Sequence, residues 1–296
     1  MRPFVLLAAP LFVAALTAAA QQPYPTRPIR MVVPYPPGGN VDITARIVGP
    51  VLGEIVGQTI VVDNRSGAGC NVGAALVAKA PPDGYTLLMG SSAPLAINPI
   101  VIKDTPYDPL TAFAPVSRVQ VVPLVLLASP KLGVGSVKEL IERARANPGK
   151  VTIASAGTGT TNHLGIELLS VRAGIKVVHV PYKGSGPALA ELLGGQVQFM
   201  FDQLTASIGY IRDGRLAALA VASAQRSTVL PNVPTFDESG LKGYEATTFI
   251  GVAGPGGMPT AVVAKLNAAM RKVMDTPSVG ERFRALGADP DRKSVV

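Results

Sequence analysis

The sequence predicts an α/β protein of two lobes, each built around a doubly wound sheet. Short runs rich in valine and isoleucine alternate with longer segments of helical periodicity, an order typical of parallel sheets covered by helices. The alternation stops in a proline-rich stretch between residues 94 and 115 and then starts again. We therefore expect a first lobe at residues 21–122 and 248–296 and a second lobe at 123–247.

Residues 1–20 have the composition of a secretory signal. Arg2 supplies a positive charge, residues 5–19 are rich in leucine, alanine and valine, and three alanines precede Gln21 as in a cleavage site. The alternative is an uncleaved anchor, but the apolar run is shorter than the ~20 residues of a spanning helix and contains Pro10. We expect export to the periplasm and a mature chain that starts near Gln21.

The first series of elements reads as strand, helix, strand, helix and strand. The strands are expected at 29–33, 59–62 and 86–89, and the helices at 41–56 and 71–80. Because a helix connects each pair of strands, these strands are expected to run parallel.

The second series begins with a clear helix signal. Ser136 and Glu139 form a capping box, and Val137, Leu140 and Ala144 recur on one face, which predicts a helix at 136–146. Strands are then expected at 151–154, 177–180, 197–201 and 216–221, and helices at 161–173 and 187–193.

Two apolar runs are the expected connections between the lobes. They lie at residues 119–127 and 247–253 and would form a two-strand hinge. A final helix is expected at 260–274, after the second connection. It should therefore return to the first lobe, which makes that lobe discontinuous in the sequence.

The composition argues against some structural and functional classes. Cys70 is the single cysteine, so no disulfide can form within the chain. The net charge of +8 is spread along the sequence without a block of lysine and arginine, which argues against a nucleic-acid-binding arm. It fits a weak general attraction for anions.

The most informative loop, at residues 34–42, follows a strand and opens a helix. Ligands of open α/β sheets lie where such loops meet helix N-termini, whose unpaired N–H groups suit a carboxylate. Gly38 and Gly39 let a ligand approach the backbone, while Pro36 after Tyr35 restricts the chain. These features predict a rigid anion site, with a simple tight turn as the alternative.

Asp42 is expected in the first turn of that helix. Its charge would favour the helix dipole but repel a bare carboxylate, so it could instead accept a proton from an ordered water or a ligand ammonium group. The alternative is a stabilising first-turn acid without any ligand contact.

A second loop, at residues 156–163, also lies between a strand and a helix. Thr158, Thr160 and Asn162 bring hydroxyl, amide and backbone donors to one place. By its position it is the counterpart of the first loop in the second lobe. The alternative is an ordinary helix cap made by Thr or Asn.

Other strand ends carry weaker candidates. In the loop at 182–187, Tyr182 could close over a ligand, whereas Lys183 is expected at the surface. Asp202 and Ser92 also fall at predicted strand ends, where turn or cap chemistry is the alternative explanation.

Groups for catalysis, metals or cofactors are scarce. His163 and His179 are the only histidines, and neither has ligands at zinc-site spacing, so we expect no metal site. Cys70 and His163 could form a nucleophilic pair. The alternative is that Cys70 is a structural residue, because packing at this helix start requires only a small side chain. The glycines at 67–73 lack the dinucleotide register, so no cofactor is expected.

A resemblance to a known family rests on many segments in the same order along the chain. They include PYPPGGNVD, PDGYTL, PYDP, HVPYKGSGPAL, LLGGQVQ, LPNVPTFDESG and GYEATTFIG. Together they resemble the substrate-binding proteins of tripartite tricarboxylate transporters, the Bug or TctC-like receptors. Cys70 stands where that family usually has glycine. Its members also usually continue beyond the segment 287–290, so a shorter ending would leave part of the first lobe uncovered.

The resemblance implies a periplasmic-binding-protein (Venus-flytrap) fold that holds a small carboxylate, an amino acid or an aromatic acid in its cleft. It implies delivery to the membrane subunits of a transporter, without catalysis and as a monomer. There are two alternatives. One is a periplasmic enzyme that acts on the same acids, with Asp42 or His163 as the acid-base group, and the other is a ligand-sensing subunit. Main-chain recognition leaves little side-chain signature, so the sequence does not define the acid. Carried to matching positions, the resemblance places the ligand at Tyr35, Pro36, Gly38, Gly39, Asp42, Ser92, Thr158, Thr160, Asn162, Tyr182 and Asp202.

Overall fold

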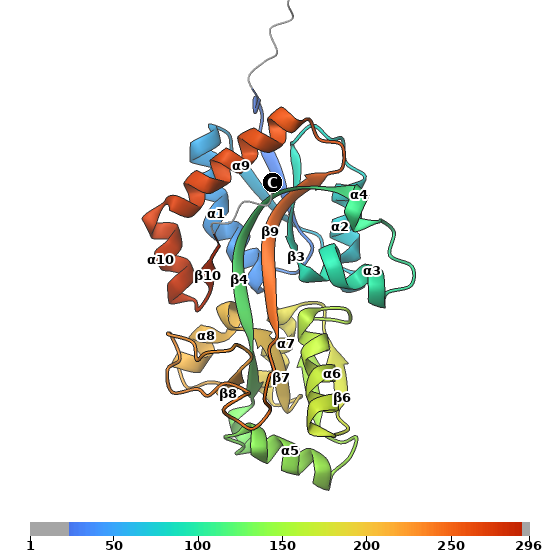
Figure 1. Cartoon of the computed structure of the whole chain (residues 1–296), viewed down its shortest axis with the longest axis vertical. Coiled ribbons are helices and arrows are strands. Elements are labelled where there is room, and N and C mark those ends of the chain that lie inside the picture. Colours follow the sequence, from blue (N-terminus) through green and yellow to red (C-terminus); the bar gives the residue numbers. More distant parts are fainter. Residues whose placement is uncertain (1–23, 292–296) are drawn as a thin grey trace, which may run out of the picture.

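Two long strands, β4 (Phe113–Ala128) and β9 (Thr247–Pro255), run from one lobe of the protein into the other (Figure 1). The computed structural model describes residues 24–291, so the expected signal at 1–20 lies outside the described residues. β4 pairs with β9 as far as Pro123 and with β7 (Phe199–Gln203) from Leu124 onward. The pairing partner of β4 therefore changes between Pro123 and Leu124.

The upper lobe of Figure 1 is built on a sheet of order β2-β1-β3-β9-β4, with β10 (Asp289–Pro290) also paired to β4. β1 (Ile29–Val33) is parallel to β2 (Ile60–Asn64) and β3 (Thr86–Ser91), whereas β9 is antiparallel to β3 and β4. The helices of this lobe are α1 (Asn40–Val56), α2 (Asn71–Ala78), α3 (Asn98–Val101), α4 (Pro109–Ala112), α9 (Thr260–Asp275) and α10 (Pro277–Ala285).

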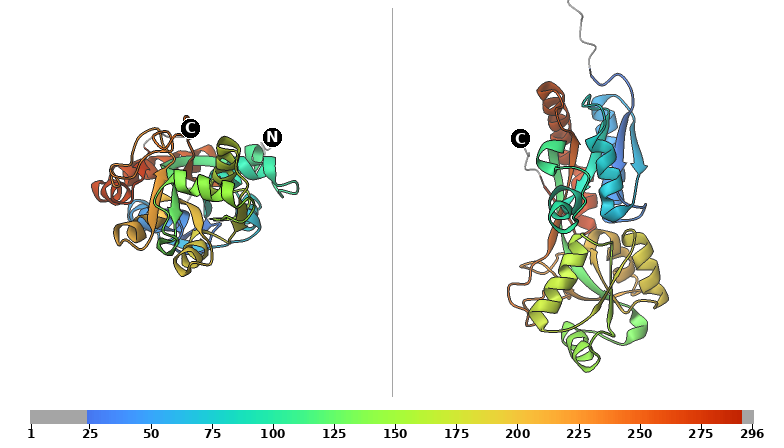
Figure 2. Two further views of the ribbon diagram at one scale, coloured as in Figure 1. Left: turned by 90° about the horizontal axis from the view of Figure 1, so that it is seen from below. Right: turned by 90° about the vertical axis from the view of Figure 1, so that its right-hand side faces the viewer.

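Alternate residues of β1 pack into different cores, and this is how the sheet comes to carry helices on both faces. Met31 and Val33 pack with α1 and α9, whereas Val32 packs with α2 on the opposite face. The period of two along a strand produces this division. Viewed from the side, the helices flank the sheets of both lobes (Figure 2).

The lower lobe is built on the sheet β4-β7-β5-β6, with β8 (Ala217–Val221) also paired to β4. β5 (Thr152–Ser155) is parallel to β6 (Val178–Pro181) and β7. Its helices are α5 (Val137–Ala146), α6 (Thr161–Ala173), α7 (Ser185–Gly194) and α8 (Leu204–Arg212). No helix within residues 24–291 is long and apolar enough to cross a bilayer.

The elements expected from periodicity occur with small shifts at their ends. The Ser136 hydroxyl accepts a hydrogen bond from the Glu139 N–H at 3.2 Å, as the capping box requires. The helices α3, α4, α8 and α10 and the short strand β10 were not predicted. The antiparallel direction of the hinge strands was not predicted either.

Candidate functional site

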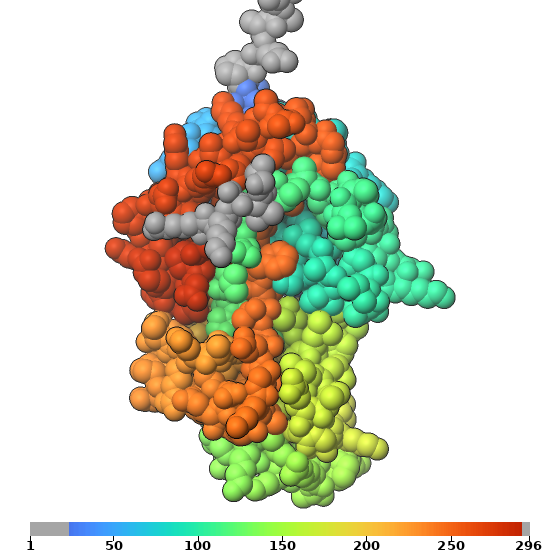
Figure 3. All heavy atoms as spheres, in the orientation of Figure 1, coloured from blue at the N-terminus to red at the C-terminus, as the bar shows by residue number. Residues whose placement is uncertain are grey.

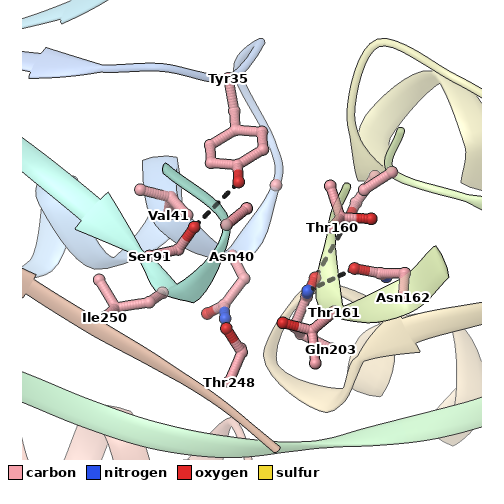
Figure 4. Close-up of a pocket in the computed structure, with 14 residues that line it drawn as sticks. Tyr35, Asn40, Val41, Ser91, Thr160, Thr161, Asn162, Gln203, Thr248 and Ile250 are labelled. Carbon is pink, nitrogen blue, oxygen red and sulfur yellow. Dashed lines mark hydrogen bonds between the residues drawn. The ribbon is translucent and has the colours of Figure 1, made fainter. Parts of the chain in front are cut away.

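The N-termini of three helices meet in one pocket between the lobes (Figure 4). α1 begins at Asn40 in the upper lobe, and α6 and α7 begin at Thr161 and Ser185 in the lower lobe. The pocket is lined by Tyr35, Gly39, Asn40, Val41, Ser91, Ala93, Ala156, Thr160, Thr161, Asn162, Ser185, Gln203, Thr248 and Ile250. None of these lining residues carries a charge.

The first turns of these helices leave backbone donors free. Gly39 and Gly184 precede α1 and α7, and neither helix has a side-chain cap. At α6 the Thr160 hydroxyl accepts only from the His163 N–H, at 3.3 Å. Unpaired N–H groups and the positive ends of three helix dipoles therefore converge, and this arrangement favours an anion.

Asn40 adds a side-chain donor to the pocket wall. Its Oδ1 accepts a hydrogen bond from Gln120 Nε2 at 2.9 Å, which fixes the orientation of the amide. Its Nδ2 is buried and has no hydrogen-bond partner among the described residues. A buried donor without a partner costs free energy, so a ligand or a water that accepts its hydrogen bond would be bound favourably here.

Asp42 holds the first loop in place instead of lining the pocket. Its Oδ2 accepts from the Gly38 N–H and from Arg46 Nε, both at 3.0 Å, and its Oδ1 accepts from Asn64 Nδ2 at 2.9 Å. Burial alone would raise the pKa of Asp42, but the hydrogen bonds from Arg46, Gly38 and Asn64 outweigh it and leave that pKa below the usual value. These contacts match the alternative of a stabilising first-turn acid.

The second loop is held by its own hydrogen bonds. The Thr160 hydroxyl donates to the Gly157 carbonyl at 2.6 Å, and Asn162 Nδ2 donates to the Phe201 carbonyl at 2.7 Å. Gln203 Nε2 then donates to Asn162 Oδ1 at 2.7 Å, as Figure 4 shows. This network presents Thr160, Asn162 and Gln203 to the pocket in fixed orientations.

Asp202 lies directly behind the pocket wall. Its side chain is 0 % exposed, and its Oδ1 accepts a hydrogen bond from the Ser185 hydroxyl at 2.6 Å. Burial raises the pKa of Asp202 to about 7, against the lowering effects of Ser185, the Gln203 amide and Asn162.

A second, larger cavity adjoins the first at Tyr35 and Ala156, which line both. The first cavity has a volume of about 20 Å³ and the second about 910 Å³. Thr158, Tyr182 and Cys70 lie along the larger one. Tyr35 is fixed at the boundary between them, because its hydroxyl bonds to Ser91 Oγ at 2.9 Å.

Glycines form the contacts between the lobes around these cavities. A Cβ atom on Gly184 would lie 2.6 Å from Pro36 Cδ, and one on Gly69 would lie 2.8 Å from the Thr158 carbonyl oxygen. The space-filling view shows that the two lobes also touch where the teal part of the upper lobe meets the yellow-green part of the lower lobe (Figure 3). The two lobes are thus in close contact on the side of the cleft.

The structure distributes the predicted site residues over three places. Tyr35, Gly39, Thr160 and Asn162 line the small pocket, and Thr158 and Tyr182 line the larger cavity. The others line neither cavity; they are Pro36, Gly38, Asp42, Ser92 and Asp202. Ser92 Oγ, for example, accepts from the Phe249 N–H at 3.1 Å and joins the end of β3 to β9.

Sequence reasoning missed several pocket residues, chiefly Asn40, Thr161, Ser185, Gln203 and Thr248. Asn40, Thr161 and Ser185 could have been found, because each is the first residue of a helix that follows a glycine-rich loop. Gln203 and Thr248 carry no such signal.

The cysteine and the histidines considered for catalysis are held in other contacts. Burial raises the pKa of the Cys70 thiol to about 12, so the reactive thiolate is scarce at neutral pH. His163 stacks on His179 with ring centroids 4.1 Å apart, and burial together with His163 lowers the pKa of His179 to about 4. Among residues 24–291, no three His, Cys, Asp or Glu side chains group as metal ligands would.

Comparison with known proteins gives consistent matches over most of the chain. The model of the tripartite tricarboxylate transporter family receptor matches residues 44–294. A structure of an R. palustris protein with adipate has 38 % sequence identity and a TM-score of 0.89, covering 92 % of this chain and 91 % of that one. The periplasmic binding protein BugD has 38 % identity, a TM-score of 0.88 and coverages of 92 % and 90 %. MatC from Rhodopseudomonas palustris with bound malate has 33 % identity, a TM-score of 0.86 and coverages of 90 % and 90 %.

Proposed function

Because this chain belongs to the tripartite tricarboxylate transporter receptor family, we propose that it captures a small carboxylate in the periplasm and delivers it to membrane subunits of a transporter. The family and the fold are those of a substrate-binding receptor. The proposal extends this to a carboxylate ligand, held between the lobes and released unchanged.

The observation that carries the proposal is the convergence of three helix N-termini on a pocket without a charged side chain. Backbone N–H groups of α1, α6 and α7, together with Asn40 Nδ2, supply donors but no full positive charge. A carboxylate gains both hydrogen bonds and dipole stabilisation there. A cation would meet the same dipoles unfavourably.

The sizes of the two cavities indicate how a ligand would be placed. A volume of about 20 Å³ holds a group the size of a water molecule, so the small pocket can take a carboxylate oxygen or a bridging water but not a whole metabolite. The body of the ligand would lie in the larger cavity, beyond Tyr35. Apolar side chains such as Val72 and Ile102 line it. Its charged lining residues are three lysines and one acid, namely Lys79, Lys103, Lys183 and Asp104.

This lining suits an acid with an apolar body and a second negative group, such as a C4 to C6 dicarboxylate. Malate and adipate, the ligands named for two similar structures, are of this class. Pro36 and Pro37 lie against Gly184 and Gly186 across the cleft, so a ligand that contacts both lobes would stabilise this closed arrangement. The transporter would then bind that form.

The test is to identify the small molecule that the purified protein binds and to determine whether the protein converts that molecule. Mass spectrometry of small molecules released from the purified protein is expected to show a carboxylate, and thermal-shift assays with malate, adipate, aspartate and benzoate should show stabilisation by at least one acid. The bound acid should be recovered unchanged after prolonged incubation. A folded protein that none of these acids stabilises, or one that converts the acid, contradicts the proposal.

A further inference from the structure

Asp202 is a buried carboxyl group that the capture of an anion does not by itself explain. It ends β7 with a side chain that is 0 % exposed, and its Oδ2 has no hydrogen-bond partner among the described residues. Its other oxygen accepts from the Ser185 hydroxyl at 2.6 Å, and Ser185 lines the small pocket. A single side chain thus separates a buried acid from the place proposed for a ligand carboxylate.

The neighbours of Asp202 are neutral on every side. Asn162 approaches from α6, Ser185 from α7 and the amide of Gln203 from the adjoining residue, while Val125 is its partner on β4. The titratable and charged groups of the surrounding helices do not contribute to the shift of its pKa; they are His163, Glu167 and Arg172 on α6, Glu191 on α7 and Tyr210 and Arg212 on α8. With burial as the dominant cause, the pKa of Asp202 rises to about 7, so both protonation states are accessible near neutral pH.

The state of Asp202 decides which way the Ser185 hydroxyl points. An ionised carboxylate can only accept, so the single proton of Ser185 is directed at Asp202 and a lone pair faces the pocket. A protonated Asp202 can donate to Ser185 Oγ, which frees the hydroxyl proton to turn toward the pocket. Ser185 is then a donor to a carboxylate instead of an acceptor that repels it.

We propose that Asp202 and Ser185 couple ligand binding to protonation, so that the receptor takes up a proton on Asp202 when a carboxylate enters the pocket. This inference rests on the proposed function. A bound carboxylate disfavours a second negative charge at Asp202 and accepts the hydrogen bond that the turned Ser185 offers. Its binding therefore takes up a proton wherever Asp202 is ionised in the free protein. Affinity should fall as pH rises above neutral, by up to about tenfold per pH unit.

The test is calorimetry of adipate binding near pH 8 in phosphate and in Tris, two buffers with different heats of ionisation. A difference in binding heat that corresponds to uptake of up to one proton supports the proposal. Asp202→Asn keeps the size of the side chain and should bind with no uptake and with an affinity that is constant from pH 6 to pH 8. His163→Gln removes another titratable group of the same lobe and should retain the uptake.

The outcomes separate this inference from the function on which it rests. Adipate binding without proton uptake, or equal uptake by Asp202→Asn, overturns the coupling and leaves the receptor function intact. Absence of binding by every carboxylate overturns both. If Asp202→Asn does not fold, infrared difference spectra of the unaltered protein give the answer, because adipate added near pH 8 should produce the band of a protonated buried carboxyl group. Lack of that band contradicts the proposal.

Discussion

Gly186, in the first turn of α7, faces the carbonyl oxygen of Pro37 across the cleft, and a Cβ atom at Gly186 would lie 3.1 Å from that oxygen. An alanine at this position would therefore hold the lobes slightly apart. We expect Gly186→Ala to weaken ligand binding by about tenfold, or ~1.4 kcal/mol, in a calorimetric titration.

Gly209→Ala is the matched control. Gly209 lies inside α8, and a Cβ atom there would meet nothing within 4 Å. Both substitutions remove a glycine from a helix and should raise the free energy of unfolding by about 0.5–1 kcal/mol. Equal ligand affinities of the two variants would show that the lobes do not need this contact to close.

Thr161, the first residue of α6, allows the preference for anions to be tested directly. A carboxylate in Thr161→Asp would sit at the helix N-terminus, where it stabilises the helix but occupies the place proposed for the ligand. We expect binding to weaken by at least about a hundredfold, or ~2.7 kcal/mol, with the thermal midpoint kept or raised. Thr161→Asn has a similar shape without the charge, and its ligand affinity should lie within a few-fold of that of the unaltered protein. Comparable losses of affinity in both variants would show that the shape of the side chain matters and not its charge.

Asp42 is expected to act through stability. Replacing it with asparagine weakens its charge-assisted bonds to Gly38, Arg46 and Asn64, so the free energy of unfolding should fall by about 1–3 kcal/mol at pH 7. Because the folded pKa of Asp42 lies below its unfolded value, its contribution is present above that unfolded value and is lost as pH falls toward the folded one. In urea titrations, the difference in the free energy of unfolding between the unaltered protein and Asp42→Asn should therefore become smaller below about pH 4. A gap that stays constant with pH would mean that the charge of Asp42 contributes nothing.

Cys70 has a backbone φ of +74°, a left-handed conformation that glycine adopts readily and other residues do not. Its buried thiol packs beside Asn98, whose Nδ2 lies 3.3 Å from Sγ. Cys70→Gly and Cys70→Ala both lose this packing, but only glycine relieves the backbone. We expect the glycine variant to be more stable than the alanine variant by about 1 kcal/mol in chemical denaturation, and the reverse order would contradict the strained backbone.

Local patterns predicted the elements well where one signal dominated. The helix at 161–173, whose first turn is capped by the Thr160 side chain, and the strand at 29–33, a short and mostly buried apolar run, occur as expected. α10 was missed although Val279 and Phe283 recur at helical spacing, since the segment is short and follows directly on α9. The antiparallel pairing of β4 and β9 depends on contacts far apart in the sequence, which no local pattern reports.

The loops of the candidate site could be recognised in the sequence, but the orientation of the polar residues at the strand ends could not. The two glycine-rich loops singled out in the sequence meet at the pocket, since Gly39 and Thr160 both line it. Whether a polar residue at a strand end faces the cleft or the interior depends on the packing behind it. That is why Asp202 is enclosed while its neighbour Gln203 reaches the pocket.

The central claim is that the cleft holds negative charge with backbone amides, and calorimetry with adipate and its uncharged diamide tests it most directly. The two compounds have the same length and differ in the charge of their ends. We expect saturable binding of adipate, or of malate if the shorter acid fits better, and binding of the corresponding diamide at least about a hundredfold weaker. A diamide that binds as tightly as its acid would contradict the account.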